Sequence, residues 1–157
     1  MDGSVLLDIL SRYVFNIANI QGMLRLATPV VLAGLCALIT DRAGILNIAG
    51  EGMILLGAWF AVAASYFFGS SLMGLLGGIV AGLVVGGLFA LFSLKFRAHI
   101  IVMGIAINIF ADAATIFLTR SVFGVAGGFT DPKIVGFGAI EIPIIKDIPI
   151  LGELLSG

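Results

Sequence analysis

The sequence predicts an all-α polytopic membrane protein with about four transmembrane helices. Hydrophobic residues make up 61% of its 157 residues and charged residues only 11%, whereas soluble domains carry about 25% charged residues. The mean hydropathy is +1.23. A helix that rises about 1.5 Å per residue needs about 20 apolar residues to cross the hydrocarbon core, so the chain has room for about four or five crossings. We therefore expect a lipid bilayer to surround most of it.

The N-terminal residues 4–20 mix apolar and polar side chains. The apolar residues at helical spacing are Leu6, Ile9, Leu10, Tyr13 and Ile17. This pattern predicts an amphipathic helix lying in the membrane interface, and a frayed N-terminal tail is the alternative. Because the stretch lacks a basic start and a small-residue cleavage site, we expect no removable signal peptide.

Four apolar runs predict membrane-spanning helices within a single transmembrane domain over residues 1–157. The runs cover approximately residues 22–40, 50–68, 72–94 and 100–118. In the third run a glycine recurs every fourth residue, at Gly74, Gly78, Gly82 and Gly86. A helix face with almost no side chains lets another backbone approach closely, so this stripe predicts helix packing.

A polar, glycine-rich segment, residues 41–52, separates the first two runs. We call it the polar break. The uncharged part of the second run, residues 53–68, is short for a membrane crossing. Part of the break is therefore expected at membrane depth, where irregular backbone must be buried in protein or line a wet cavity. Asn47 and Glu51 are candidates for bracing the start of the second helix and for lining a substrate path. Purely structural capping is the alternative.

The fourth run carries polar residues on one face. Gly104, Asn108, Asp112, Thr115 and Thr119 are spaced by three or four positions, which places them on one side of a helix. A carboxylate at the middle of a bilayer costs at least about 2.5 kcal/mol, so Asp112 is expected to face the bundle interior or water. Asn108, Asp112 and Thr115 are candidate substrate-path residues, and hydrogen bonding between helices is the alternative.

The remaining residues, 121–157, contain prolines and charges but no apolar run of membrane length, which predicts an extramembrane or re-entrant segment. Placing the basic turn at residues 95–99 in the cytoplasm leaves three Lys or Arg inside and five outside. This count opposes the positive-inside rule.

The sequence lacks the motifs of several kinds of catalytic and binding site. No lysine has the neighbours of a phosphate-binding Walker A loop, and the single His99 and single Cys36 provide no zinc or Cys/His site. Apart from Asp112, no acid lies in the apolar stretches of the predicted spans, residues 22–40, 53–68, 72–94 and 100–118, so the pair needed for aspartyl catalysis is missing. With a net charge of −1 and no basic run, nucleic acid is excluded as a partner. We expect no enzymatic role, no metal and no cofactor.

The motif in residues 42–53, RAGILNIAGEGM, resembles the permease subunits of ATP-binding cassette (ABC) importers for nucleosides and simple sugars. The resemblance covers residues 20–157 and continues through Phe96-Arg97-Ala98, Ile107-Asn108-Ile109 and Thr119-Arg120 in the family's order. Branched-chain amino acid permeases are similar in outline. In that group a His precedes the Gly-Glu pair, whereas Ala49 stands here, so amino acids rank second.

The resemblance implies a multi-pass protein in the cytoplasmic membrane of a prokaryote. It implies partner ABC ATPase subunits that hydrolyse ATP, a second permease subunit and an extracytoplasmic solute-binding lipoprotein. It also places the turn at residues 95–99 inside the cell and residues 121–157 outside, and we adopt this orientation.

The sequence departs from the family in two respects. It stops well short of a complete permease, without a cytoplasmic coupling loop, and Asp112 stands where a small or hydroxyl residue is expected. A truncated, non-transporting membrane module is therefore an alternative function.

Overall fold

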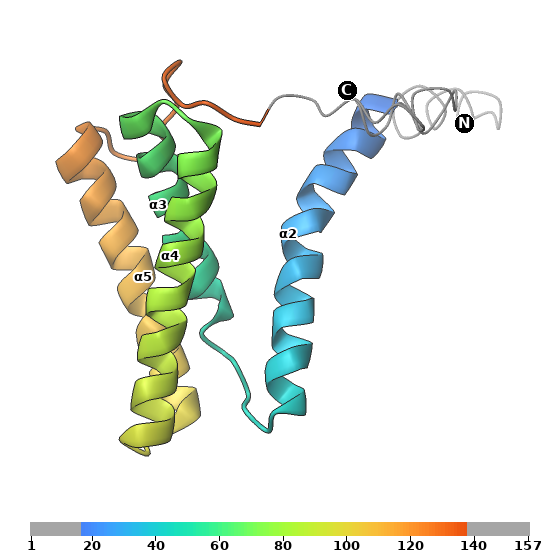
Figure 1. Cartoon of the computed structure of the whole chain (residues 1–157), viewed down its shortest axis with the longest axis vertical. Helices are drawn as coiled ribbons and strands as arrows, with labels where there is room; N and C mark the ends of the chain where they lie inside the picture. Colours follow the sequence, from blue (N-terminus) through green and yellow to red (C-terminus); the bar gives the residue numbers. More distant parts are fainter. Residues whose placement is uncertain (1–16, 138–157) are drawn as a thin grey trace, which may run out of the picture. The chain divides into compact units, whose positions relative to one another are not determined.

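The described part of the protein is built of helices joined by short connections. The structure is a computed structural model, and it describes residues 17–137. The elements are α2 (Ile17–Arg42), α3 (Gly50–Phe68), α4 (Ser71–Ala90), the π-helix η2 (Leu91–Lys95) and α5 (Ile100–Phe123) (Figure 1). No strand occurs in residues 17–137. The predicted all-α fold class is confirmed.

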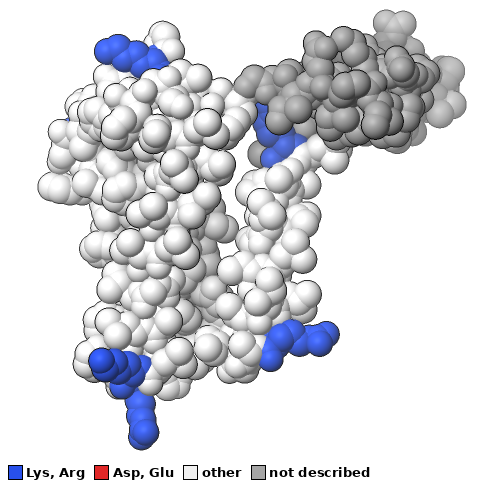
Figure 2. Space-filling model, viewed as in Figure 1, with Lys and Arg blue, Asp and Glu red and all other residues white. Residues whose placement is uncertain are grey.

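Four stretches of these helices are long and apolar enough to cross a membrane. They are Asn19–Arg42, Gly50–Phe68, Ser71–Lys95 and Ile100–Phe123. On the face shown in Figure 2, Lys and Arg side chains lie near the helix ends, and the middle of the helices carries none. Large apolar side chains are widely exposed, such as Leu83 at 70% and Phe117 at 67%. This surface suits contact with lipid tails and confirms a polytopic membrane protein.

Several helices extend beyond the predicted spans. Helix α2 begins at Ile17 and α5 ends at Phe123, whereas the predicted spans begin at residue 22 and end at residue 118. Hydropathy marks only the hydrocarbon-crossing part, while the backbone stays helical past it. Residues 17–20 therefore belong to α2 and not to a separate interfacial helix. The rest of that predicted helix, 4–16, and residues 138–157 of the predicted C-terminal segment lie outside the described residues.

The chain divides into two compact units, Met1–Leu32 with Phe137–Gly157, and Ala33–Gly136. In the first unit the described residues are mainly the beginning of α2, which contains Pro29. Because proline has no backbone N–H, the usual hydrogen bond to the Arg25 carbonyl cannot form. One residue earlier, the Thr28 hydroxyl donates to the Leu24 carbonyl at 2.8 Å.

In the second unit, α3 packs against both α4 and α5. Buried Leu56, Val85 and Ala111, one from each helix, meet in a small core. Helices α3 and α4 approach so closely at Gly77 that a Cβ added there would lie only 2.7 Å from the Ala64 Cβ.

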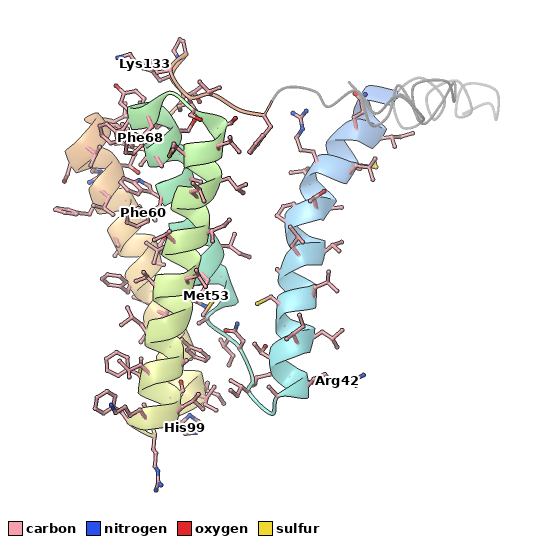
Figure 3. All side chains as sticks on the ribbon, viewed as in Figure 1. Arg42, Met53, Phe60, Phe68, His99 and Lys133 are labelled. Carbon is pink, nitrogen blue, oxygen red and sulfur yellow. The ribbon has the colours of Figure 1, made fainter. Side chains whose placement is uncertain are left out.

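The helix directions set the two ends of this unit. Helix α3 leads away from the polar break, α4 and η2 return, and α5 leads away again. The polar break therefore enters from the end that carries residues 96–99 and reaches inward to Asn108 on α5, and residues 124–136 lie at the other end. Figure 3 shows His99 toward one end and Phe68 and Lys133 toward the other, with Met53 between them. Polar groups gather at both ends and along α5.

Candidate functional site

The polar break begins with a defined helix stop. The Gly44 amide donates to the Asp41 carbonyl at 2.9 Å, and the Ile45 amide donates to the Thr40 carbonyl at 2.9 Å. This pair of bonds is a Schellman motif, which needs a left-handed residue at its centre. Gly44 supplies it with a φ of 77°. The sequence therefore ends α2 sharply and releases residues 45–49 as non-helical backbone.

The side chain of Asn108, on α5, binds this backbone through both ends of its amide. Its Oδ1 accepts from the Gly52 backbone N–H at 2.8 Å, and its Nδ2 donates to the Ile48 carbonyl at 3.0 Å. Gly52 lies in the first turn of α3, where backbone N–H groups have no partner within the helix. The residue before α3, Ala49, makes no side-chain cap. Asn108 therefore caps α3 from a neighbouring helix.

Two glycines allow this close approach. A Cβ on Gly52 would lie 3.0 Å from the Asn108 Oδ1, and a Cβ on Gly104 would lie 2.8 Å from the Ile48 Cβ. Ala49, between them, is 0% exposed. The break is thus packed tightly on α5 and is not a loose loop.

Asn47 and Glu51 lie in the break but do not form the helix cap. The Asn47 Nδ2 is 4.0 Å from the sulfur atoms of both Cys36 and Met53, and its buried Oδ1 has no hydrogen-bond partner. Glu51 is exposed in the first turn of α3, where a negative charge suits the helix dipole. The capping contact expected of these two residues is made instead by Asn108.

An open pocket of about 390 Å³ lies between α3, α5 and the segment that follows α5. Of the sequence-predicted path residues, Asp112 and Thr115 line it, while Asn47, Glu51 and Asn108 do not. Its full lining is Leu55, Ala58, Trp59, Val62, Asp112, Thr115, Ile116, Thr119, Phe123, Gly127 and Phe129. The volume falls within the range of small-molecule sites, about 300–1,000 Å³. Asp112 is exposed and brings the one ionisable group of this lining.

A chain of hydrogen bonds runs along the pocket wall. The Trp59 indole N–H donates to the Thr119 hydroxyl at 2.9 Å, which donates to the Thr115 carbonyl at 2.7 Å. The Thr115 hydroxyl in turn donates to the Ala111 carbonyl at 2.8 Å. These bonds fix the Trp59 indole against α5, so the hydrogen-bonding groups on this side of the pocket are already in place before a solute binds.

Aromatic rings form the end of the pocket away from the break. Phe123 and Phe129 stack with centroids 3.9 Å apart, and Trp59 lies 6.0 Å from Phe123. The segment that carries Phe129 is anchored to α3, because the buried Ser65 hydroxyl donates to the Val135 carbonyl at 2.8 Å and accepts from the Val135 N–H at 3.0 Å. We call Trp59, Phe123 and Phe129 the aromatic wall.

The sequence interpretation did not predict the aromatic wall. Its partner Thr119 was placed on the polar face of the fourth run, and Trp59 is the only tryptophan of the sequence. Nothing in the local sequence linked Phe129 or Ser65 to the site. No group of three or more His, Cys, Asp or Glu side chains suited to a metal occurs within residues 17–137. The arrangement is suited to binding a solute.

Comparison with known proteins places this geometry in context. Residues 19–146 match the protein family described as branched-chain amino acid transport system / permease component. The chain is 34% identical over 134 residues to the guanosine ABC transporter permease protein NupQ of Bacillus subtilis, covering 82% of this chain and 41% of that protein.

Two further relatives come from other organisms. The putative glucose ABC transporter permease protein TsgC13 of Haloferax volcanii is 28% identical over 143 residues, covering 88% of this chain and 41% of that protein. The nucleoside ABC transporter permease protein NupC of Lactococcus lactis subsp. cremoris is 28% identical over 141 residues, covering 86% and 44%. The chain thus spans about two fifths of the length of these relatives. No solved structure gives a significant match.

Proposed function

Because the chain belongs to the family of branched-chain amino acid transport system permease components, we propose that it forms part of the membrane pathway of an ABC importer for nucleosides or simple sugars. It is a multi-pass protein of the prokaryotic cytoplasmic membrane. The observation that carries the proposal is the family match over residues 19–146, which includes all four apolar helices.

Relatives support the solute class. Proteins named for guanosine, for nucleosides and for glucose are similar to this chain over at least 82% of its length. The pocket supports the same class, because an apolar site with a few fixed polar groups suits a neutral polar solute. A carboxylate such as that of Asp112 in a membrane-spanning helix is also a mark of a solute pathway.

The proposed mechanism assigns one side of the membrane to each end of the second unit. The end with residues 124–136 faces a solute-binding lipoprotein outside the cell. The end with the polar break and residues 96–99 faces the cytoplasm, where partner ATPase subunits hydrolyse ATP. A second permease subunit completes the pathway beside this chain. The chain itself supplies helices and a binding surface, without a catalytic step.

The test is transport by the complete importer that contains this chain. The complex is reconstituted in proteoliposomes with ATP inside and its binding protein outside, and uptake of labelled nucleosides, pentoses and leucine is compared. We expect ATP-dependent uptake of a nucleoside or a sugar. Uptake of leucine alone would assign the chain to amino acid transport, and no uptake of any solute by an intact complex would contradict an importer role.

A further inference from the structure

The pocket offers hydrogen-bond acceptors and almost no free donors. The side-chain donors in its wall are the Trp59 indole and the Thr115 and Thr119 hydroxyls, and each already donates within the protein. In the described part of the chain, the Asp112 carboxylate has no side-chain or backbone donor. A solute that enters therefore meets two unpaired carboxylate oxygens and must bring the donors itself.

The charge of the pocket points the same way. Asp112 carries the only charge in the lining. The basic groups nearest in sequence are engaged or placed elsewhere: Arg120 is exposed in the last turn of α5, outside the lining, and the Lys133 Nζ lies 5.5 Å from the centre of the Tyr66 ring. With no cation in the wall, a phosphate or a second carboxylate is repelled by Asp112, and the low dielectric of the membrane strengthens that repulsion.

The shape of the lining divides the pocket into two parts. Asp112 and Thr115 lie near the middle of α5, and the aromatic wall lies toward its C-terminal end. Flat ring systems such as nucleobases stack on aromatic side chains, whereas a carboxylate accepts hydrogen bonds from two neighbouring hydroxyls at once. A second pocket of similar size, about 380 Å³ between α3 and α4, is lined by apolar residues and glycine and lacks such a polar end.

We propose that the pocket binds an uncharged ribonucleoside, and that Asp112 determines specificity by accepting hydrogen bonds from the 2′- and 3′-hydroxyls of its ribose. The base packs against the aromatic wall. The unpaired carboxylate excludes the corresponding nucleotide, whose phosphate finds no donor. This inference rests on the proposed importer function and narrows it to one solute class and one residue.

The experiment measures selectivity in the reconstituted importer with one binding protein throughout, so that differences between variants report the membrane pathway. Uptake of labelled adenosine is compared with uptake of 2′,3′-dideoxyadenosine by the unchanged chain and by Asp112→Ala. We expect the kcat/KM of the unchanged chain to be about tenfold or more higher for adenosine than for the dideoxy analogue. The analogue lacks the hydroxyls that donate to Asp112, and losing a hydrogen bond to a charged group has an effect of this size. In Asp112→Ala the preference should fall to about twofold or less.

Asp41→Asn is the matched control, because it also removes one exposed acid but lies outside the pocket. It should keep the adenosine preference of the unchanged chain. An unaltered preference in Asp112→Ala, at normal complex yield, would overturn the proposal. Import of pentoses without nucleosides would overturn it too, while leaving the importer function intact.

A second measurement uses adenosine 5′-monophosphate as a competitor. It should not inhibit adenosine uptake by the unchanged chain, and it should begin to inhibit uptake by Asp112→Asn, because the repelling charge is gone. A purely structural role of Asp112 would lower uptake without changing this discrimination. Equal inhibition by the nucleotide in both proteins would contradict the proposed exclusion.

Discussion

A single amide on α5 satisfies two backbone groups of a distant segment. Asn108 accepts from Gly52 and donates to Ile48, and an asparagine is well suited to this because its amide offers an acceptor and a donor side by side. In a membrane the alternative, an unpaired backbone group in hydrocarbon, is costly. The irregular break can therefore persist beside apolar helices.

Replacing Asn108 by alanine should destabilise the fold. The Gly52 amide and the Ile48 carbonyl would lose their partner, and we expect the free energy of unfolding to fall by about 1–3 kcal/mol. Thermal denaturation of the detergent-purified complex measures the change. Asp112→Asn, one turn along the same helix, is the control and should leave the melting temperature nearly unchanged. Equal losses in the two variants would contradict the capping role.

The sequence placed Asn108 and Asp112 on one helix face but could not separate their roles. Spacing along a helix determines which residues share a face, since it depends only on helix geometry. Which neighbour stands opposite each residue depends on packing between helices. Asn108 meets the unpaired amide of Gly52, whereas Asp112 opens into the pocket. Only the three-dimensional structure contains that difference.

At the scale of the helix, the glycine stripe of α4 packs against α3 over only part of its length. Cβ atoms on Gly74 and Gly78 would lie 3.0 Å from the Ala61 carbonyl and 3.2 Å from the Gly57 carbonyl, but nothing lies within 4 Å of one on Gly82 or Gly86. Four residues turn a helix by about 40° more than a full circle, so a stripe of period four drifts off a straight neighbour.

Gly77 is a packing glycine that the four-residue spacing of the stripe did not include. It interrupts the stripe yet makes the tightest contact with α3, since an added Cβ would lie 2.7 Å from the Ala64 Cβ and 2.9 Å from the Phe60 carbonyl. Gly77→Ala should lower the free energy of unfolding by about 1–3 kcal/mol through overpacking. The readout is the melting temperature of the purified complex.

Gly82→Ala is the control for this prediction. It introduces the same methyl group in the same helix, into open space, and alanine favours helix more than glycine does. Its melting temperature should be unchanged or slightly higher. A drop as large as that of Gly77→Ala would mean that the α3–α4 contact is not what the glycine protects.

At the scale of the whole chain, the sequence predicted what depends on local pattern. Composition gave the membrane class and apolar runs gave four helices, because both follow from the hydrocarbon thickness. The closure of the pocket by the segment after α5 was not predictable. It joins Ser65 to Val135, which lie 70 residues apart, and no periodicity relates them. That anchor ties the segment that carries Phe129 to α3.

Ser65→Ala tests the anchor. Loss of both hydrogen bonds should release residues 124–136 from α3, so the Val135 amide should exchange its hydrogen at least about tenfold faster, as expected for a net loss of about 1.5 kcal/mol or more. Hydrogen-exchange mass spectrometry of the purified complex gives the readout. Ser70→Ala, whose hydroxyl makes no cap hydrogen bond on α4, should leave exchange in this segment unchanged. Unchanged protection in Ser65→Ala would show that other contacts hold the segment.

Asn108 and Asp112 are four residues apart, about 6 Å along the axis of α5. A rigid turn of helix joins them, so any shift that draws Asp112 toward cargo would pull on the backbone between residues 48 and 52 at the same moment. In the proposed importer, this turn of α5 would link the binding of a solute at Asp112 to the position of the polar break, and Asn108→Ala would weaken that link.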